Sequence, residues 1–219
     1  MIKAFVFDMD GVIYDTERIC RIAWKEAAQI HQLDRIEEDL DACTGLNRHD
    51  TELYFKNKYG ADFDFASFNQ RTRQYSKDYL AQHGVPLKPG VVELLEELKK
   101  RNCPIALATS THKESAMAHL TETNLTKYFD AIITGDMVTH SKPDPEIYLI
   151  ACKALATNPH NCAAIEDSPN GIRSAYNANM NAIMVPDLIA PTEEISKLLS
   201  YRFDSLLELK DSLSTLLSE

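Results

Sequence analysis

The sequence predicts an α/β protein whose core is a doubly wound parallel sheet, interrupted by one inserted helical segment. From residue 89 onward, short apolar segments alternate with amphipathic ones, which is typical of parallel strands joined by helices on both faces of a sheet. One more apolar segment stands near the N-terminus, before a long stretch of helical periodicity. The first strand and the later strands therefore belong to one sheet, and the stretch between them is the insertion.

The first strand is predicted over residues 4–7, where four apolar residues in a row indicate a buried parallel strand. Asp8 and Asp10 follow directly, and Gly11 indicates the turn that ends the strand. Open α/β sheets bind their ligands at the carboxyl ends of the strands, so both carboxylates are candidates for chemistry. A single aspartate in this place more often caps a turn. The later strands decide between these two interpretations.

The helical segment runs from about Thr16 to Gln82 and is rich in charged and aromatic residues. Its first helix has an apolar face, and further helices are expected at residues 53–54 and 65–79, with Gly45 and Gly60 separating them. The residues of that apolar face are Ile19, Ile22, Ala23 and Ala27. We therefore assign residues 1–15 and 83–219 to the α/β core, and residues 16–82 to an α-helical cap over the strand ends.

The remaining strands are expected at residues 105–108, 131–134, 163–165 and 182–185. A helix precedes them, with Pro89 near its first position and an apolar face formed by Val91, Leu94, Leu95 and Leu98. Further helices near residues 113–123, 145–155, 169–178 and 193–199 alternate with the strands.

Hydroxyl groups follow the strand at residues 105–108, in Thr109, Ser110 and Thr111. Thr111 and Glu114 fit a capping box at the start of the next helix. Hydroxyls and free backbone N–H groups at such a start suit a phosphate, whereas plain N-capping is the alternative.

Lys142 comes after the next strand, just before a helix that Asp144 is expected to cap and Pro145 to begin. A lone lysine is usually solvated. This lysine stands at the same sheet edge as Asp8 and Asp10, where its charge has a use.

Two adjacent acids, Glu166 and Asp167, end the strand at residues 163–165, and Ser168 is expected to cap the helix that follows. Four acids at one sheet edge repel one another unless something compensates their charge. A divalent cation together with Lys142 is the natural compensation. Mg²⁺ is normally held in this way, by few carboxylates together with water and substrate phosphate.

Composition excludes several classes of protein. The 219 residues carry a net charge of −10, which argues against a nucleic-acid or anionic-membrane partner. No apolar stretch approaches the ~18 residues of a membrane span, and acids occupy the place of a signal peptide's apolar core. Five widely spaced cysteines without a CxxC pair indicate reduced thiols in a cytoplasmic protein. Nothing in the sequence indicates an oligomeric state.

Taken in order, these motifs resemble the four motifs of the haloacid dehalogenase superfamily. They are Asp8-x-Asp10-Gly11-Val12, the hydroxyl of Thr109, Lys142-Pro143 and Glu166-Asp167. Asp15-Thr16-Glu17, the run Ser-Lys-Pro-Asp-Pro-Glu and the run Glu-Asp-Ser-Pro-Asn-Gly-Ile resemble the phosphatase and beta-phosphoglucomutase branch. The resemblance covers essentially the whole chain and implies a Rossmann-like core with an α-helical cap.

The resemblance also implies roles for the matching positions. Asp8 is expected to be the nucleophile that forms an aspartyl-phosphate, and Asp10 the general acid and base. Thr109 and Ser110 are expected to hold phosphoryl oxygens, and Lys142 to neutralise Asp8 and the phosphate.

The same resemblance implies a magnesium cofactor. Asp8, the backbone carbonyl of Asp10 and Asp167 are expected to bind Mg²⁺. Glu166 is expected either to bind it directly or to orient the groups that do.

The cap is expected to contact the substrate, a small phosphorylated metabolite such as a sugar or polyol phosphate. The loop at residues 44–48 resembles one that supplies an arginine in beta-phosphoglucomutases, so Arg48, together with Lys77, is a candidate for binding substrate. Cys20 stands where those mutases carry a histidine, and Glu17 is more acidic than the residue expected there. These departures favour a Mg²⁺-dependent phosphatase. A beta-phosphoglucomutase is the alternative, and a catalytically idle binding or regulatory protein is a further one.

Overall fold

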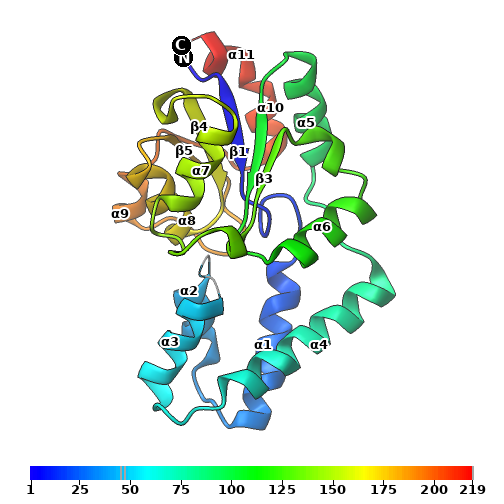
Figure 1. The fold of residues 1–219 in the computed structure, drawn as a ribbon, viewed down its shortest axis with the longest axis vertical. Coiled ribbons are helices and arrows are strands. Elements are labelled where there is room, and N and C mark those ends of the chain that lie inside the picture. The colour runs from blue at the N-terminus through cyan, green and yellow to red at the C-terminus, as the bar shows by residue number, and fades with distance from the viewer. Residues whose placement is uncertain (45, 47, 219) are drawn as a thin grey trace.

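The computed structural model describes residues 1–44, 46 and 48–218, and its centre is one parallel sheet (Figure 1). The sheet has six strands in the order β3-β2-β1-β4-β5-β6, and every neighbouring pair is parallel. The strands are β1 (Ala4–Phe7), β2 (Ile105–Ala108), β3 (Ala131–Ile133), β4 (Cys162–Glu166), β5 (Asn181–Met184) and β6 (Tyr201–Arg202). The predicted parallel sheet is therefore confirmed, and β1 lies inside it between β2 and β4.

Helices cover both faces of the sheet, because the central strands β2, β1 and β4 are buried on both faces. In β1, Phe5 and Phe7 join one buried cluster, whereas Ala4 and Val6 join another on the opposite face. The first cluster includes residues of α5 (Val91–Lys100), α6 (Lys113–Glu122), α10 (Leu206–Asp211) and α11 (Leu213–Ser218). The second includes residues of α7 (Glu146–Ala154), α8 (Pro169–Asn177) and α9 (Glu193–Ser196). Short 3₁₀ turns are η1 (Thr126–Tyr128), η2 (Gly135–Met137) and η3 (Pro159–Asn161).

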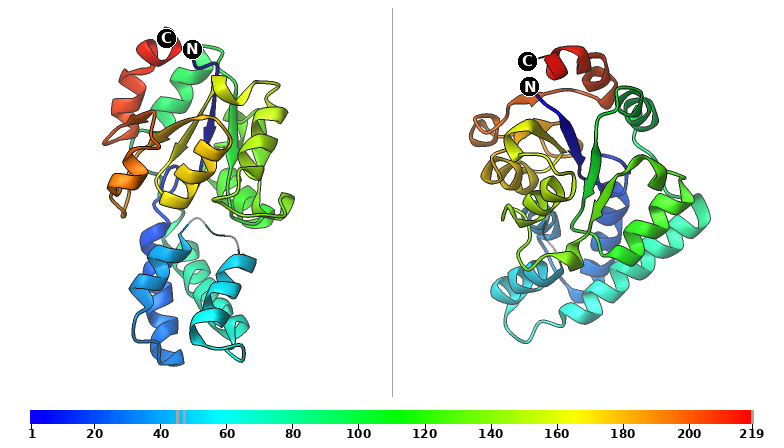
Figure 2. Two further views of the ribbon diagram at one scale, coloured as in Figure 1. Left: turned by 90° about the vertical axis from the view of Figure 1, so that its left-hand side faces the viewer. Right: turned by 45° about the horizontal axis from the view of Figure 1, so that its top comes forward.

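The inserted segment forms four helices that lie together beyond the carboxyl ends of the strands (Figures 1 and 2). They are α1 (Glu17–His31), α2 (Ile36–Cys43), α3 (Arg48–Tyr59) and α4 (Phe65–His83). Their own apolar cluster surrounds the fully buried ring of Phe55, which stacks on Phe63 with 5.4 Å between ring centroids. The expected inward position of Ile22 is wrong: 44% of this residue is exposed, because the buried face of α1 follows Ile19, Ala23 and Ala27.

Several predicted element boundaries differ from the structure for identifiable reasons. The capping box at Thr111 and Glu114 is wrong: α6 has His112 at its N-cap, and the Thr111 hydroxyl donates to Asp10 instead. Helix α7 begins at Glu146, one residue later than expected, although the Asp144 carboxylate does accept the Glu146 N–H at 2.9 Å. Ser168 caps α8 as predicted, by accepting the Gly171 N–H.

The C-terminal elements β6, α10 and α11, of two to six residues, were not predicted. All five cysteines are free thiols, and four of them are buried. Among the described residues, no helix is long and apolar enough to cross a membrane.

Candidate active site at the carboxyl edge of the sheet

The turn after β1 carries the two aspartates and passes directly over the end of β4. The Asp8 N–H donates to the Ile165 carbonyl at 2.9 Å, so the ladder between β1 and β4 continues into the site. Gly11 then turns with a φ of +82°, a conformation that favours glycine. A Cβ at Gly11 would lie 2.2 Å from Oδ2 of Asp167. Only glycine lets the first turn approach this carboxylate so closely.

Lys142 is a buried cation at the centre of this edge, with 2% of its surface exposed. Its ammonium donates to Oδ1 of Asp8 at 2.6 Å, to Oε1 of Glu166 at 2.6 Å and to the Ala108 carbonyl at 3.2 Å. It also lies 5.1 Å from the centre of the Tyr148 ring. Lys142 thus contacts Asp8, the predicted nucleophile, as expected from the position of this lysine at the sheet edge.

Glu166 uses both of its carboxylate oxygens inside the protein. Oε1 accepts from Lys142 and from the Tyr148 hydroxyl at 2.7 Å, and Oε2 accepts from the Ser168 hydroxyl at 3.1 Å. A Cβ at Gly171 would lie 1.9 Å from the Glu166 carboxyl carbon, so α8 can pack here only with glycine at that position. Glu166 is therefore a fixed internal partner of Lys142.

The carboxylates of Asp8, Glu166 and Asp167 form one crowded acidic group, whose ligand atoms lie within 4.8 Å of one another. Burial raises the pKa of Asp8 well above its ordinary value, although the Lys142 charge opposes this shift. Burial also raises the pKa of Asp167, and the neighbouring charges of Glu166, Glu17 and Asp8 add to it. Three buried acids with a single lysine leave negative charge uncompensated, which fits a bound divalent cation.

Asp10 is held by hydroxyl groups from two different segments. The Thr16 hydroxyl donates to Oδ1, and the Thr111 hydroxyl donates to Oδ2 at 2.8 Å. Thr109, almost fully buried at the end of β2, accepts the Thr111 N–H on its own hydroxyl at 3.0 Å. Ser110 lies between these two threonines. The predicted phosphate-binding turn and the two aspartates therefore meet at one place.

The residues predicted to bind substrate lie in helices α3 and α4. Arg48 is the first residue of α3 and Lys77 lies in α4, and both are exposed. Gly45 and Asn47 of the predicted substrate loop lie outside the described residues. The neighbouring Thr44 carbonyl accepts from the Asn170 side chain at 2.8 Å, so Thr44 lies at the start of α8. Substrate binding by Arg48 and Lys77 stays a prediction.

Tyr148 and Glu17 also lie at this edge, although the sequence predicts neither of them there. Tyr148 has the pattern of an ordinary core aromatic, and nothing in the sequence indicates that its hydroxyl reaches Glu166. Glu17 was noted only for its acidity. Burial, followed by the charges of Asp10 and Asp187, raises the pKa of Glu17 to about 7.

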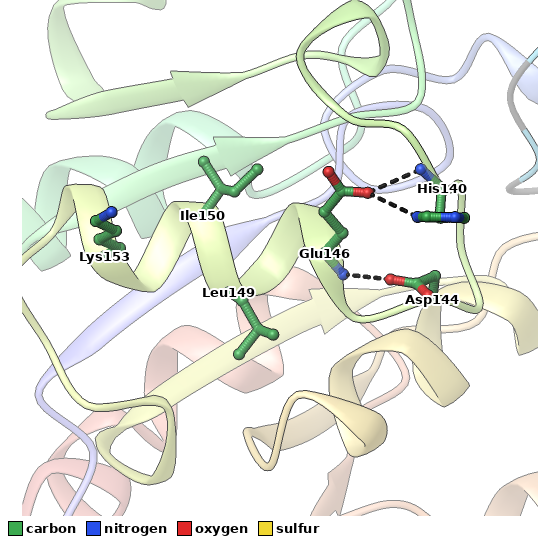
Figure 3. A pocket seen from close by; sticks show the side chains of 6 residues that line it. All are labelled: His140, Asp144, Glu146, Leu149, Ile150 and Lys153. Atoms are coloured by element: carbon green, nitrogen blue, oxygen red, sulfur yellow. Dashed lines mark hydrogen bonds and ion pairs between the residues drawn. The ribbon is translucent and has the colours of Figure 1, made fainter.

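A second group of possible metal ligands, His140, Asp144 and Glu146, lines a shallow pocket of about 320 Å³ beside α7 (Figure 3). Oε2 of Glu146 accepts the His140 N–H at 2.8 Å, and its carboxylate also accepts the Thr139 N–H. These acids are therefore occupied in closing the turn that carries Lys142.

The family model for haloacid dehalogenase-like hydrolases matches residues 5–185. The chain belongs to this family. Among its haloacid dehalogenase-like relatives, a phosphorylated carbohydrates phosphatase of Thermotoga maritima is 32% identical over 83% of this chain and 83% of its own. A beta-phosphoglucomutase of Bacillus subtilis is 32% identical over 84% of this chain and 83% of its own.

A solved structure shows the same haloacid dehalogenase-like fold. The beta-phosphoglucomutase of Clostridium difficile superposes with a TM-score of 0.81 and 28% identity, over 100% of this chain and 98% of that one. The family and the fold expected from the four motifs are thus confirmed.

Proposed function

We propose that this protein is a Mg²⁺-dependent phosphatase that hydrolyses a small phosphorylated metabolite through an aspartyl-phosphate on Asp8. The observation that supports this best is the contact of the Asp8 carboxylate with the buried Lys142 ammonium at 2.6 Å, beside the acids Glu166 and Asp167. A carboxylate attacks an anionic phosphate only where positive charge lowers their repulsion. Lys142 supplies that charge from the protein itself.

In the first half of the reaction, a carboxylate oxygen of Asp8 forms a bond to phosphorus as the bond from phosphorus to the leaving oxygen breaks. Asp10 gives its proton to that leaving oxygen. In the second half, Asp10 takes a proton from the water that attacks the phosphoryl group, which releases inorganic phosphate and restores Asp8. The hydroxyls of Thr16 and Thr111 hold Asp10 in place for both proton transfers.

The remaining residues bind phosphoryl oxygens or Mg²⁺, or neutralise charge. We propose that the Thr109 hydroxyl and the Ser110 N–H bind phosphoryl oxygens, and that Asp8, the Asp10 carbonyl and Asp167 hold Mg²⁺. When bound, Mg²⁺ supplies Lewis-acid stabilisation of charge on the transferring group. Glu166, whose two oxygens are already occupied, acts by fixing Lys142.

We further propose that residues 16–82 act as a cap, with residues 1–15 and 83–219 as the core. Helices α1–α4 lie beyond the carboxyl edge where the proposed catalytic residues meet (Figure 1). The Asn170–Thr44 contact and a hydrogen bond from the Ser141 hydroxyl to Asp50 join them to the core next to the site. A cover in this place excludes bulk water and selects the substrate.

A sugar or polyol phosphate is the proposed substrate class, since the relative from Thermotoga maritima is named for phosphorylated carbohydrates. Beta-phosphoglucomutase is the second candidate, because a relative of that name is equally similar. The deciding experiment incubates a panel of sugar, polyol and nucleotide phosphates, follows released phosphate and follows glucose 6-phosphate. We expect phosphate release that requires Mg²⁺ and Asp8. Failure of every phosphomonoester would reject the proposal and favour a binding protein.

A further inference from the structure

The two chain segments that connect the helices α1–α4 to the sheet run side by side and are hydrogen-bonded to each other. The Asp15 N–H donates to the Pro86 carbonyl at 3.0 Å, and the Lys88 N–H donates to the Ile13 carbonyl at 2.9 Å. Tyr14 and Leu87 form an antiparallel bridge between them. We call this pair of segments, residues 13–18 and 86–88, the hinge ribbon. Any movement of the helical segment relative to the sheet must therefore bend the backbone of the hinge ribbon.

Each segment of the hinge ribbon contributes a cationic side chain that lies close to the Asp187 carboxylate. The Lys88 ammonium lies 2.7 Å from Oδ1 of Asp187, and the Arg18 guanidinium lies 3.8 Å from the same oxygen. Asp15 joins the group, with Oδ1 at 3.3 Å from Arg18 and 3.8 Å from Lys88. The Asp187 side chain is 2% exposed, so water screens these interactions poorly.

Asp187 belongs to the sheet edge that carries the proposed catalytic site. It follows β5, which pairs with β4 through Glu166 and Met184, and the Val185 N–H donates to the Glu166 carbonyl at 2.8 Å. The Asp187 charge is one of those that raise the pKa of Asp167 and of Glu17, as expected for a close neighbour. Oδ2 of Asp187 is buried, and it has no hydrogen-bond partner among the described residues.

We propose that Asp187 is a positioning residue, which clamps both segments of the hinge ribbon to the edge of the sheet that carries Asp8 and Asp167. One oxygen holds the hinge ribbon through Lys88, while the carboxylate stays beside the catalytic acids. Loosening this clamp changes how the helical segment sits over the site, without removing any group that touches the substrate. The kinetic part of this inference rests on the proposed function, whereas the structural part does not.

The burial of the Asp187 carboxylate decides which variants test the clamp. Removing Lys88 alone leaves a buried carboxylate without its closest cation, which destabilises a protein for reasons unrelated to the hinge. Asp187→Asn avoids this problem, because Lys88 and Arg18 are both partly exposed and can turn to water. The double variant Lys88→Met with Asp187→Asn removes both partners and checks that the effect belongs to the pair.

Lys99 and Asp130 provide a control pair of the same residue types and the same distance. They form another Lys–Asp pair of 2.7 Å, and Asp130 also accepts the Ile105 N–H at the start of β2. The start of β2 lies at the opposite end of the strand from the proposed site. Lys99→Met with Asp130→Asn therefore removes a Lys–Asp pair of the same length, although a more exposed one, without touching the hinge ribbon.

The first measurement is hydrogen exchange of the full chain without substrate. In Asp187→Asn and in the double variant, we expect the amides of Asp15 and Lys88 to exchange about 10-fold faster, because the charge-assisted contacts that hold these segments are lost. Amides of β1 and β4 should keep their wild-type rates, and the control should change neither set. Unchanged exchange in the hinge ribbon, or equal acceleration throughout the sheet, would overturn the proposal.

The second measurement compares p-nitrophenyl phosphate with a sugar phosphate that the wild-type enzyme hydrolyses. For Asp187→Asn we expect kcat/KM to fall about 10- to 100-fold on the sugar phosphate, which the helical segment must position, and far less on the small aryl ester. An equal loss on both substrates would contradict a positioning role. If the wild-type protein hydrolyses neither, the proposed function fails, and hydrogen exchange alone still decides the clamp.

Discussion

Removing Lys142 should damage stability and catalysis together, because one buried ammonium serves both. In Lys142→Met, the carboxylates of Asp8 and Glu166 each lose a contact of 2.6 Å in surroundings with almost no water. Breaking a buried ion pair by deleting one partner typically destabilises a protein by about 3–5 kcal/mol. We expect a loss of this size for the metal-free protein at pH 8, measured by urea unfolding.

The pH dependence of this loss of stability follows from the direction in which the pKa of Asp8 shifts. Burial already raises the pKa of Asp8, and without Lys142 it must rise further. The folded variant then binds protons more tightly than its unfolded chain, so its stability falls as the pH rises. The difference between variant and wild type should therefore be smaller at pH 5 than at pH 8.

Measurements of activity separate the catalytic role of Lys142 from its stabilising role. The loss of one charged group that stabilises the transferring phosphoryl should reduce kcat about 100- to 1,000-fold. Adding Glu166→Gln to Lys142→Met removes one of the two stranded charges, so it should restore part of the stability and none of the activity. Lys197→Met, which breaks an exposed pair with Glu193, is the control and should change neither. A Lys142→Met protein with wild-type stability at pH 8, or with nearly full activity, would refute this reasoning.

Three other results are expected. Burial, with Asp10 and Asp187, raises the pKa of Glu17 from 4.5 to about 7, so the metal-free protein should lose stability as the pH rises between these values. Glu17→Gln should remove that loss, up to about 3 kcal/mol in unfolding experiments at pH 8 and nothing at pH 4. Mg²⁺ should be required for turnover and Ca²⁺ should inhibit it, because Ca²⁺ takes a larger and looser set of ligands; full activity in excess chelator would contradict the metal site. With beta-glucose 1-phosphate and a trace of bisphosphate, released phosphate should exceed glucose 6-phosphate, because the Cys20 thiol is a weak hydrogen-bonding group where the mutases have a histidine; the opposite ratio would identify a mutase.

The parts of the fold that could be predicted depend on patterns within one segment. The apolar runs of β1, β2 and β4 are buried on both faces, so composition alone indicates them. Parallel strands place their carboxyl ends at one edge, which is why Asp8, Lys142 and Glu166 were expected to meet. The two-residue strand β6 has no such pattern, because its pairing with β5 depends on the rest of the sheet.

The parts of the site that could not be predicted depend on contacts between distant segments. The Thr111 hydroxyl fits a helix cap in the sequence, yet it bonds Asp10, 101 positions away. Tyr148 reaches Glu166 only because α7 packs on the sheet against β1, β2 and β3. Asp187 meets Lys88 across 99 positions. No local spacing distinguishes these three residues from ordinary caps, core aromatics and surface charges.

Asp8 is the residue expected to carry the phosphoryl group. The most direct test uses the Asp10→Asn variant, in which transfer from acetyl phosphate needs no general acid but breakdown of the intermediate lacks its base. The sample is quenched in acid within one turnover, digested and analysed by mass spectrometry. We expect one phosphoryl group on the peptide that contains Asp8, and none when Asp8→Asn is added. Turnover without this adduct, or an adduct on another residue, would contradict the mechanism.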